Sequence, residues 1–492
     1  MTPSAGGNES RRVWSWRVFL TCWLVYTAFW APYIVREHFP ALALLERGSL
    51  DVTAYVDWSK DIFRSRRGGA FINNLPGASL TAAAALLPLR PVLERVDRWN
   101  RALPRPPGGE DDGDLFWRTL AEGRALYFLL VGFLTVALVM APATAGAIAY
   151  LCARLMDAGV SGARAAQVAL LCGLATPVFF RTGYLNHNLL VGDAGLVALL
   201  LLWDPSDRPL SPGRAAVAGL LAGYAVLCDY SGVVVVAVAG FYAWLRSSGR
   251  SSGARWRVMA AFSAGVAPAL IALAAYQLWA FGSLYRPPQH YMTPTAPTKR
   301  GYRGLDWPSP ALLWANFFDP RFGLFAFSPV LFLAFAAPFV RRVGIRVPRR
   351  ETGIILTYFV LFVVFCAANQ YSWLQPSTGF RYLVPVVPLL ALLAVQVGQA
   401  LPRPLRWVLA AAACAQSLLL AAVHSSDAWR AAGTLWRRGF KLPWMIRLGE
   451  SGVAVTWVWP LSTFLLLAAA LALVWLAPGP RRCSRARSAA RG

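Results

Sequence analysis

Acidic side chains gather in a long polar segment, residues 36–123, that follows the first hydrophobic stretch of the chain. Glu37 comes directly after that stretch, and Asp57 and Asp61 lie further along the segment. A hydroxyl group has a pKa far above 7, so its attack on a carbon centre benefits from a carboxylate that accepts its proton, by typically ~10²–10⁴-fold. Glu37 is the first candidate for this base, and Asp57 and Asp61 are alternates. Each could instead be a solvated or ion-paired interfacial charge.

Cationic side chains would complement such a base if the leaving group carries a phosphate. Arginine suits this role because its planar guanidinium binds phosphate oxygens in a bidentate fashion. Arg381 is the best candidate because it opens a hydrophobic stretch, although it could simply anchor a helix end. Further candidates are Arg124, Arg321, Lys60 and His187, the last of which could equally cap a helix turn.

The elements that must position these residues are hydrophobic. Of the 492 residues, 57% are hydrophobic and only 14% are charged, against about 25% charged in globular proteins. Runs near 20 residues recur, and each is long enough to cross ~30 Å of hydrocarbon. The sequence therefore predicts an all-α, polytopic membrane protein. Twelve spans are expected, at residues 17–35, 125–153, 165–180, 189–203, 214–229, 231–246, 257–281, 324–340, 352–369, 382–400, 406–423 and 456–477.

One further apolar segment, residues 76–93, is predicted to lie at the membrane interface without crossing it. If it does not cross, the arginine-rich short connectors fall on one side, which the positive-inside rule assigns to the cytoplasm. Both termini are then cytoplasmic, including a basic tail at residues 479–492. Segments 36–123, 282–323 and 424–455 then face outward, and a bacterial plasma membrane is the expected location. Segments 214–229 and 231–246 could form a tight hairpin or one broken helix.

The net charge of +25 is explained by these connectors, so no nucleic-acid partner is expected. Six of the seven cysteines lie in apolar runs and the seventh lies in the basic tail, so no structural disulfide is expected. No HxxH spacing argues for a bound metal. No cofactor is firmly predicted, and a divalent cation remains possible.

Several motifs carry a resemblance to a known family. Glu37 follows the first span, a Gly48-Ser49-Leu50 stretch comes next, and Asn74-Leu75-Pro76-Gly77 opens the interfacial segment. These residues resemble the first loop of the GT-C superfamily of polytopic glycosyltransferases, which includes protein O-mannosyltransferases and lipid A aminoarabinose transferases. Arg124 matches an arginine that opens the second span in the mannosyltransferases. Looser similarities lie at Thr176-Pro177 to His187, Phe281-Gly282-Ser283-Leu284, Asp319-Pro320-Arg321-Phe322-Gly323 and Gly379-Phe380-Arg381-Tyr382.

The resemblance covers most of the chain and departs from the family pattern at two places. Arg36-Glu37 stands where the family has an Asp-Glu pair, and Asn74-Leu75-Pro76 stands where it has Lys-Pro or His-Pro. It implies an inverting glycosyltransferase that moves a sugar from a polyprenyl-phosphate donor to a glycan, lipid or protein acceptor at the outer membrane face. A lipid-linked glycan ligase or polymerase, and a twelve-span transporter, are the alternatives.

Overall fold

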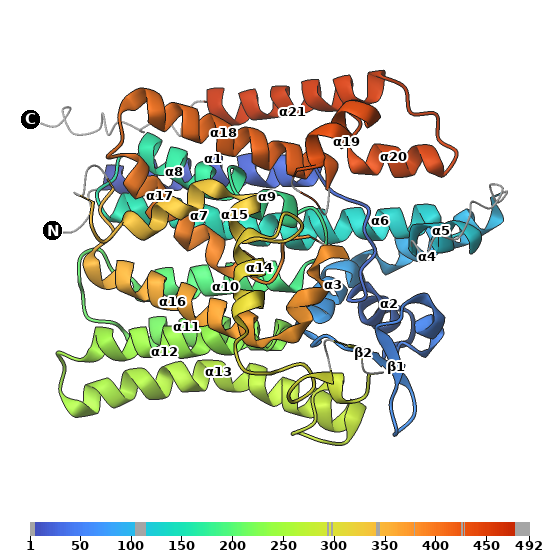
Figure 1. Ribbon diagram of the computed structural model, residues 1–492, viewed down its shortest axis with the longest axis horizontal. Coiled ribbons are helices and arrows are strands. Elements are labelled where there is room, and N and C mark those ends of the chain that lie inside the picture. The colour runs from blue at the N-terminus through green and yellow to red at the C-terminus, as the bar shows by residue number, and fades with distance from the viewer. Residues whose placement is uncertain are drawn as a thin grey trace, which may run out of the picture.

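The computed structural model describes residues 5–103, 115–292, 295–296, 299–340, 345–377, 379–424, 427 and 429–477. The described chain is mostly helical, with very little sheet. Its two named strands, β1 (Ile62–Arg64) and β2 (Ala70–Ile72), form one small antiparallel sheet with Phe63 opposite Phe71. Most of the long helices run side by side along the long axis of the molecule (Figure 1). The basic tail predicted at residues 479–492 lies outside the described residues.

Five helical segments are long and apolar enough to cross a membrane. The first is continuous from α6 (Ala125–Thr135) through a π-helical turn, η3 (Val136–Met140), into α7 (Ala141–Asp157). The others are α13 (Ser252–Phe281), α16 (Arg349–Ala368), α18 (Arg403–Val423) and α21 (Val458–Leu476). The fold class is therefore that of an all-α membrane protein, as the sequence predicts.

Shorter apolar helices occupy most of the other predicted spans. They pack between the long ones around a continuous apolar core. They are α8 (Gly162–Leu174), α10 (His187–Leu202), α11 (Pro212–Cys228), α12 (Gly232–Ser247) and α17 (Val387–Gly398), with η8 (Val384–Val386) ahead of the last. The chain enters the bundle through α1 (Ala5–Ala28), and a short α9 (Val178–Arg181) follows α8.

Residues 324–340, predicted to form one membrane-spanning helix, do not form a single regular helix. They form α15 (Leu324–Phe327) and then a 3-10 helix, η6 (Pro329–Ala336). Proline has no N–H to donate to the preceding turn and its ring clashes with that turn, so a regular α-helix does not continue through it. Pro329 stands at this break.

Small residues allow the helices on one side of the bundle to pack closely. A side chain on Gly219 would lie 2.1 Å from the carbonyl oxygen of Phe262, and one on Gly265 would lie 2.1 Å from that of Ala216. Helix backbones approach each other in this way where neither carries a bulky side chain. The pair α11 and α13 is therefore held by backbone-to-backbone contact.

The segment from Asp229 to Ser231 is a turn between two helices. Gly232, the first residue of α12, lies against the backbone of Ala225 and Val226 in α11, where a Cβ would come within 2.4 Å. Helices α11 and α12 lie side by side (Figure 1). The structure therefore has the hairpin rather than one broken helix.

The long segment after α1 is folded against one end of the bundle. It contains α2 (His38–Arg47), η1 (Thr53–Trp58), the β1–β2 sheet, α3 (Gly77–Leu86), η2 (Leu87–Leu89), α4 (Arg90–Ala102) and α5 (Leu115–Ala121). The predicted interfacial segment 76–93 thus corresponds to α3, η2 and the start of α4. Ten residues of α3 extend only ~15 Å, about half of a hydrocarbon core.

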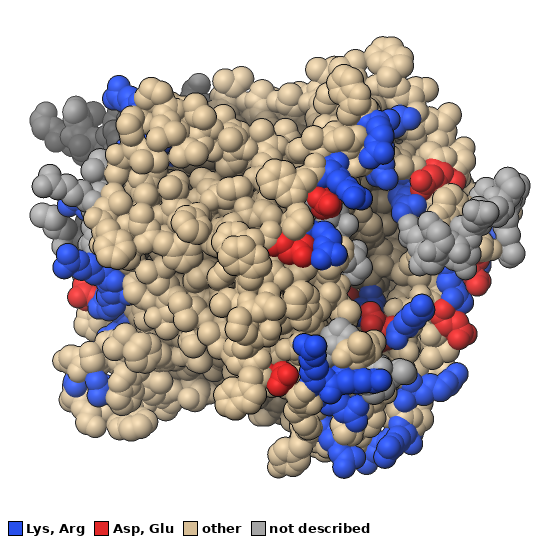
Figure 2. Space-filling model, viewed as in Figure 1, with Lys and Arg blue, Asp and Glu red and all other residues tan. Residues whose placement is uncertain are grey.

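The remaining predicted outer segments carry short helices. Segment 282–323 contains η4 (Pro288–His290) and α14 (Pro310–Phe318), and η7 (Gln370–Ser377) follows α16. Segment 424–455 contains α19 (Ala431–Arg438) and α20 (Pro443–Glu450). Figure 2 shows a broad band without charged side chains across the middle of the visible face, with charges at both ends. Such a band is what a membrane-embedded surface requires, because unpaired charges are costly in hydrocarbon.

Candidate functional site

A large pocket of about 1530 Å³ opens at the end of the bundle that carries α3 and the β1–β2 sheet. Six of the eight residues predicted for the site line it: Glu37, Asp57, Lys60, Asp61, His187 and Arg381. They come from the segment after α1, from the start of α10 and from the segment before α17. The fold therefore brings together side chains that are far apart in the sequence.

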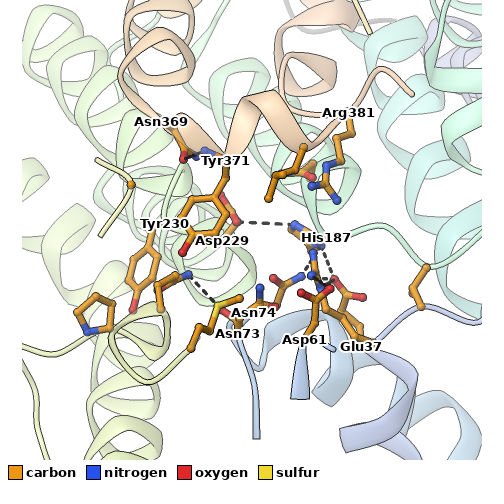
Figure 3. A pocket seen from close by; sticks show the side chains of 18 of the residues that line it. Glu37, Asp61, Asn73, Asn74, His187, Asp229, Tyr230, Asn369, Tyr371 and Arg381 are labelled. Carbon is orange, nitrogen blue, oxygen red and sulfur yellow. Dashed lines mark hydrogen bonds and ion pairs between the residues drawn. The ribbon is translucent and has the colours of Figure 1, made fainter. Parts of the chain in front are cut away.

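Glu37 and His187 form the closest pair of the site. The Nδ1 atom of His187 lies 2.6 Å from Oε1 of Glu37, and the two side chains are only 8% and 3% exposed. The amide of Asn74 donates a hydrogen bond to the same carboxylate oxygen, and its nitrogen lies 3.2 Å from Nδ1 of His187. Figure 3 shows these three side chains pointing toward one another. Glu37 is thus a buried carboxylate held by partners from two other elements.

Local structure explains how each member of this group is placed. Asn186 is the N-cap of α10, and its side chain accepts a hydrogen bond from the N–H of Leu189. Capping therefore falls to Asn186, which leaves His187 free to reach Glu37. On the other side, the hydroxyl of Ser79 in α3 donates to the backbone oxygen of Glu37 at 2.8 Å. Helix α3 is thereby tied to the candidate base.

His38 follows Glu37 in sequence but lies outside this group. Its Nδ1 faces the backbone of Val35 at 3.1 Å, and its Nε2 lies 3.2 Å from the hydroxyl of Thr135. Burial lowers the pKa of His38 to about 4. An imidazole in this environment is neutral near pH 7 and holds α2 against the bundle.

A second carboxylate lies across the imidazole from Glu37. Oδ2 of Asp229 is 3.7 Å from Nε2 of His187, so the ring lies between two acids. Asp229 belongs to the turn between α11 and α12, and its Oδ1 accepts a hydrogen bond from the N–H of Ser231. Asp229 is not among the residues that the sequence patterns predict for the site. The sequence feature that could have indicated it is an acidic residue in a very short connector between two apolar runs.

The electrostatic balance around Glu37 favours the ionised carboxylate. Burial by itself raises the pKa of Glu37, but its contacts with His187 and Arg36 outweigh burial and hold the pKa below its ordinary value. The Nε of Arg36 is 3.9 Å from Oε1 of Glu37, and its NH1 forms an ion pair with Asp61. Arg36 therefore joins two of the three predicted acids.

The sheet and the neighbouring loop fix the remaining acids. Asp61 directly precedes β1, and the hydroxyl of Ser65 at the other end of that strand donates to the backbone oxygen of Ala280 at 2.6 Å. Asp57 and Lys60 are exposed at the rim of the pocket. Asp61 is thus the more firmly placed of the two alternate bases.

Arg381 points into the pocket from above His187 (Figure 3). Its NH2 donates to the hydroxyl of Tyr382 at 3.2 Å and the guanidinium lies over the Tyr382 ring, 4.7 Å from its centre. Within the described residues it forms no ion pair, and its buried Nε–H has no hydrogen-bond acceptor. Arg381 is therefore a cation beside the Glu37–His187 pair with N–H groups available to bind a ligand.

The other two predicted arginines lie elsewhere. Arg124 pairs with Asp97 at 2.8 Å and with Glu46 at 3.3 Å, and it lines an adjoining cavity of about 530 Å³ that shares Asp57 and Trp58 with the large pocket. Arg321 is exposed and pairs with Asp319 at 2.8 Å. Neither borders the large pocket. As placed here, both would serve the local structure of their own segments.

The walls of the pocket have two characters. Toward the bundle they are apolar, with Val226 and Val233 from the α11–α12 hairpin, Leu273 from α13 and Phe365 from α16. Toward the outer end they are polar and aromatic, with Tyr302, Arg303, Tyr371 and Trp373. Between them, Gln277 donates to the hydroxyl of Tyr230 at 2.8 Å. One pocket can thus accept an apolar chain and a polar group together.

Metal binding was left open by the sequence. Among the residues that the structure describes, no group of three or more His, Cys, Asp or Glu side chains is arranged to hold a metal ion. Whether a divalent cation takes part is therefore still untested. Comparisons with protein-family models, with curated proteins and with solved structures find no match to this chain.

Proposed function

We propose that this protein is an inverting glycosyltransferase that moves a sugar from a polyprenyl-phosphate donor to an acceptor at the outer face of a bacterial plasma membrane. The observation that carries the proposal is the Glu37–His187 pair, 2.6 Å apart, in a pocket that has both an apolar wall and Arg381, a cation without an ion-pair partner in the described part of the chain. A lipid-linked sugar has matching parts, namely a hydrocarbon chain, a phosphate and a polyhydroxyl group. The acceptor can be a glycan, a lipid or a protein.

The proton of the acceptor hydroxyl goes to the Glu37–His187 pair. The acceptor oxygen forms a bond to the anomeric carbon while the bond from that carbon to the phosphate oxygen breaks, and the departing phosphate keeps the electron pair. One displacement of this kind inverts the anomeric centre. Imidazole ordinarily titrates near neutral pH and suits a general base, and a carboxylate on its other nitrogen fixes its orientation. Glu37 serves as that carboxylate or accepts the proton itself.

The departing polyprenyl phosphate needs positive charge near its oxygens. Preorganised cations in a site with little water stabilise such charge strongly because they need not reorganise during the reaction. Arg381 fills this role, with Lys60 at the rim and Arg36 beside Asp61. Aromatic side chains such as Tyr371 and Trp373 offer faces on which sugar rings can stack.

The proposal includes the membrane topology. In it, twelve segments cross the membrane, with residues 324–340 crossing as α15 and η6 instead of one α-helix. Both termini are then in the cytoplasm, the pocket lies on the outer face, and α3 rests against the outer leaflet. The polyprenyl chain then reaches the pocket along the apolar wall formed by Val233 and Phe365. The charge distribution of the short connectors supports this arrangement.

The form of phosphate released tests the proposal. We would incubate the purified protein with a total lipid extract of the cells that produce it and follow polyprenyl phosphates by mass spectrometry. A monosaccharide transferase releases the polyprenyl monophosphate, whereas a lipid-linked glycan ligase or polymerase releases the pyrophosphate and a transporter releases neither. Release of the pyrophosphate alone, or no release beyond that of the Glu37→Gln variant, contradicts the proposal.

A further inference from the structure

A narrow groove lies between α8, η6, α17 and α18, away from the large pocket. Its volume is about 160 Å³, and its walls are mostly apolar, with Val168 and Leu171 on α8, Leu331 on η6 and Ala394 on α17. In Figure 1, α8, α17 and α18 lie toward the end where α1 begins, whereas α3 and the β1–β2 sheet lie at the other end. The groove is therefore separate from the site described above.

The two ends of the groove differ in polarity and burial. Arg164 and Gln167 are exposed and Arg406 is partly exposed at one end, whereas Ala175 and Thr176 are buried at the other. Both arginines lie in the first turn of their helices, α8 and α18. Within the described part of the chain, neither forms an ion pair. The groove thus has a basic mouth and a mostly apolar interior.

The dimensions of the groove fit one hydrocarbon chain. The distance along α8 from Arg164 to Ala175 is ~16 Å at 1.5 Å per residue, close to half of a ~30 Å hydrocarbon core. An apolar cavity of about 150 Å³ holds a molecule of the size of benzene. A groove of 160 Å³ therefore encloses about six carbons of one chain and no helix, and the rest of the chain lies along the partly exposed α18 wall.

We propose that this groove binds an anionic phospholipid of the leaflet on that side, with its phosphate between Arg164 and Arg406 and one acyl chain running toward Thr176. Charge decides the class of lipid, because two guanidinium groups without carboxylate partners favour a head group with net negative charge. Each arginine near a membrane surface attracts an anionic head group. Two of them together should favour binding of an anionic lipid over a zwitterionic lipid by roughly thirty-fold. The inference does not depend on the proposed transferase activity.

Competition between two lipids tests this inference. The full-length protein would be equilibrated with equal amounts of phosphatidylglycerol and phosphatidylcholine, and the lipid retained would be counted by native mass spectrometry. We expect one phosphatidylglycerol per protein in the wild type. The Arg164→Gln/Arg406→Gln double variant should lose the preference. Arg12→Gln/Arg257→Gln is the matched control, because it removes two charges from exposed positions outside the groove and should keep the preference.

A second variant blocks the interior and leaves both arginines in place. Ala413→Phe adds a ring to the α18 wall of the groove at a partly exposed position, and it should abolish retention of the lipid while thermal unfolding shows a folded protein. Equal retention of both lipids by the wild type overturns the inference. So does an equal loss in the control variant, or preferential retention of a polyprenyl phosphate added in the same competition.

Discussion

His187 Nδ1 lies 2.6 Å from Glu37 Oε1, in a contact that joins the first residue of α10 to the segment just after α1. Both side chains are nearly excluded from solvent, and a carboxylate and an imidazole at this distance behave as one unit. Asn74 and Arg36 add two further donors around the same carboxylate. The unit therefore supplies a fixed anion next to a group that can exchange protons.

Replacing Glu37 by Gln should lower the rate of sugar transfer by ~10²–10⁴-fold, because the amide cannot accept a proton or balance a charged imidazole. Transfer by purified protein and its thermal unfolding midpoint would be measured together. Glu450→Gln is the control, since Glu450 pairs with Arg447 on α20 and does not border the pocket. Near-normal turnover of Glu37→Gln would discard the base assignment.

Asp229→Asn should reduce kcat by roughly ten-fold while the protein stays folded. The asparagine oxygen can still accept the hydrogen bond from Ser231, so the α11–α12 turn is kept, but the negative charge opposite His187 is lost. A positioning role predicts a changed pH profile of kcat as well as a lower rate. An unchanged profile together with a lower unfolding midpoint would show that Asp229 serves only the turn.

The pH dependence of stability gives a separate test of the pair. The pKa of Glu37 in the folded protein lies below its ordinary value. The ionised carboxylate therefore stabilises the folded protein at any pH above the pKa of Glu37 in the unfolded chain. This stabilisation is lost as the pH falls through the lower pKa of the folded protein. His187→Gln removes the larger of the two side-chain contacts that lower the pKa, so burial, which raises it, is then opposed mainly by Arg36. The acid limb of stability should then move to higher pH by roughly one unit.

Thermal unfolding midpoints of the wild type and of His187→Gln between pH ~3 and ~7 would measure this shift. His290→Gln is the control, because it also removes a histidine but changes no contact of Glu37. Superimposable acid limbs for the wild type and His187→Gln would mean that the imidazole does not set the ionisation of Glu37.

Sequence patterns predict the helices well because long apolar runs have few alternatives in a membrane. They predicted the pocket residues Glu37, Asp61 and Lys60 because all lie in one polar segment, and Arg381 because it opens a span. They missed Asp229, since nothing local reveals that its turn faces His187. They also could not show that Arg124 pairs with Asp97 and Glu46, because ion-pair partners far apart in sequence are set by the tertiary fold.

Arg381→Gln and Arg124→Gln should therefore have different effects. Loss of Arg381 removes a cation from the pocket, so transfer should fall by roughly 10²-fold with little change in stability. Loss of Arg124 leaves Asp97 and Glu46 without their shared partner and should lower the unfolding free energy by about 2 kcal/mol, since these carboxylates are partly exposed. Kinetics and denaturation of both variants would be compared. A purely kinetic defect in Arg124→Gln would place it in donor binding instead.

Gly77→Ala tests whether the close packing of α3 on α11 positions the residues around His187. A Cβ on Gly77 would lie 2.7 Å from the backbone of Leu227 and Cys228, directly before Asp229, so α3 or the end of α11 must shift. Asn74 and Asp229 flank this contact, and both should move relative to His187. We expect a loss of about 1–3 kcal/mol of stability together with at least a ten-fold loss of transfer. Gly213→Ala is the matched control, because a Cβ there meets nothing within 4 Å and the residue lies in the first turn of α11. If Gly77→Ala transfers sugar as fast as Gly213→Ala, close packing of α3 on α11 is not what holds the catalytic group together.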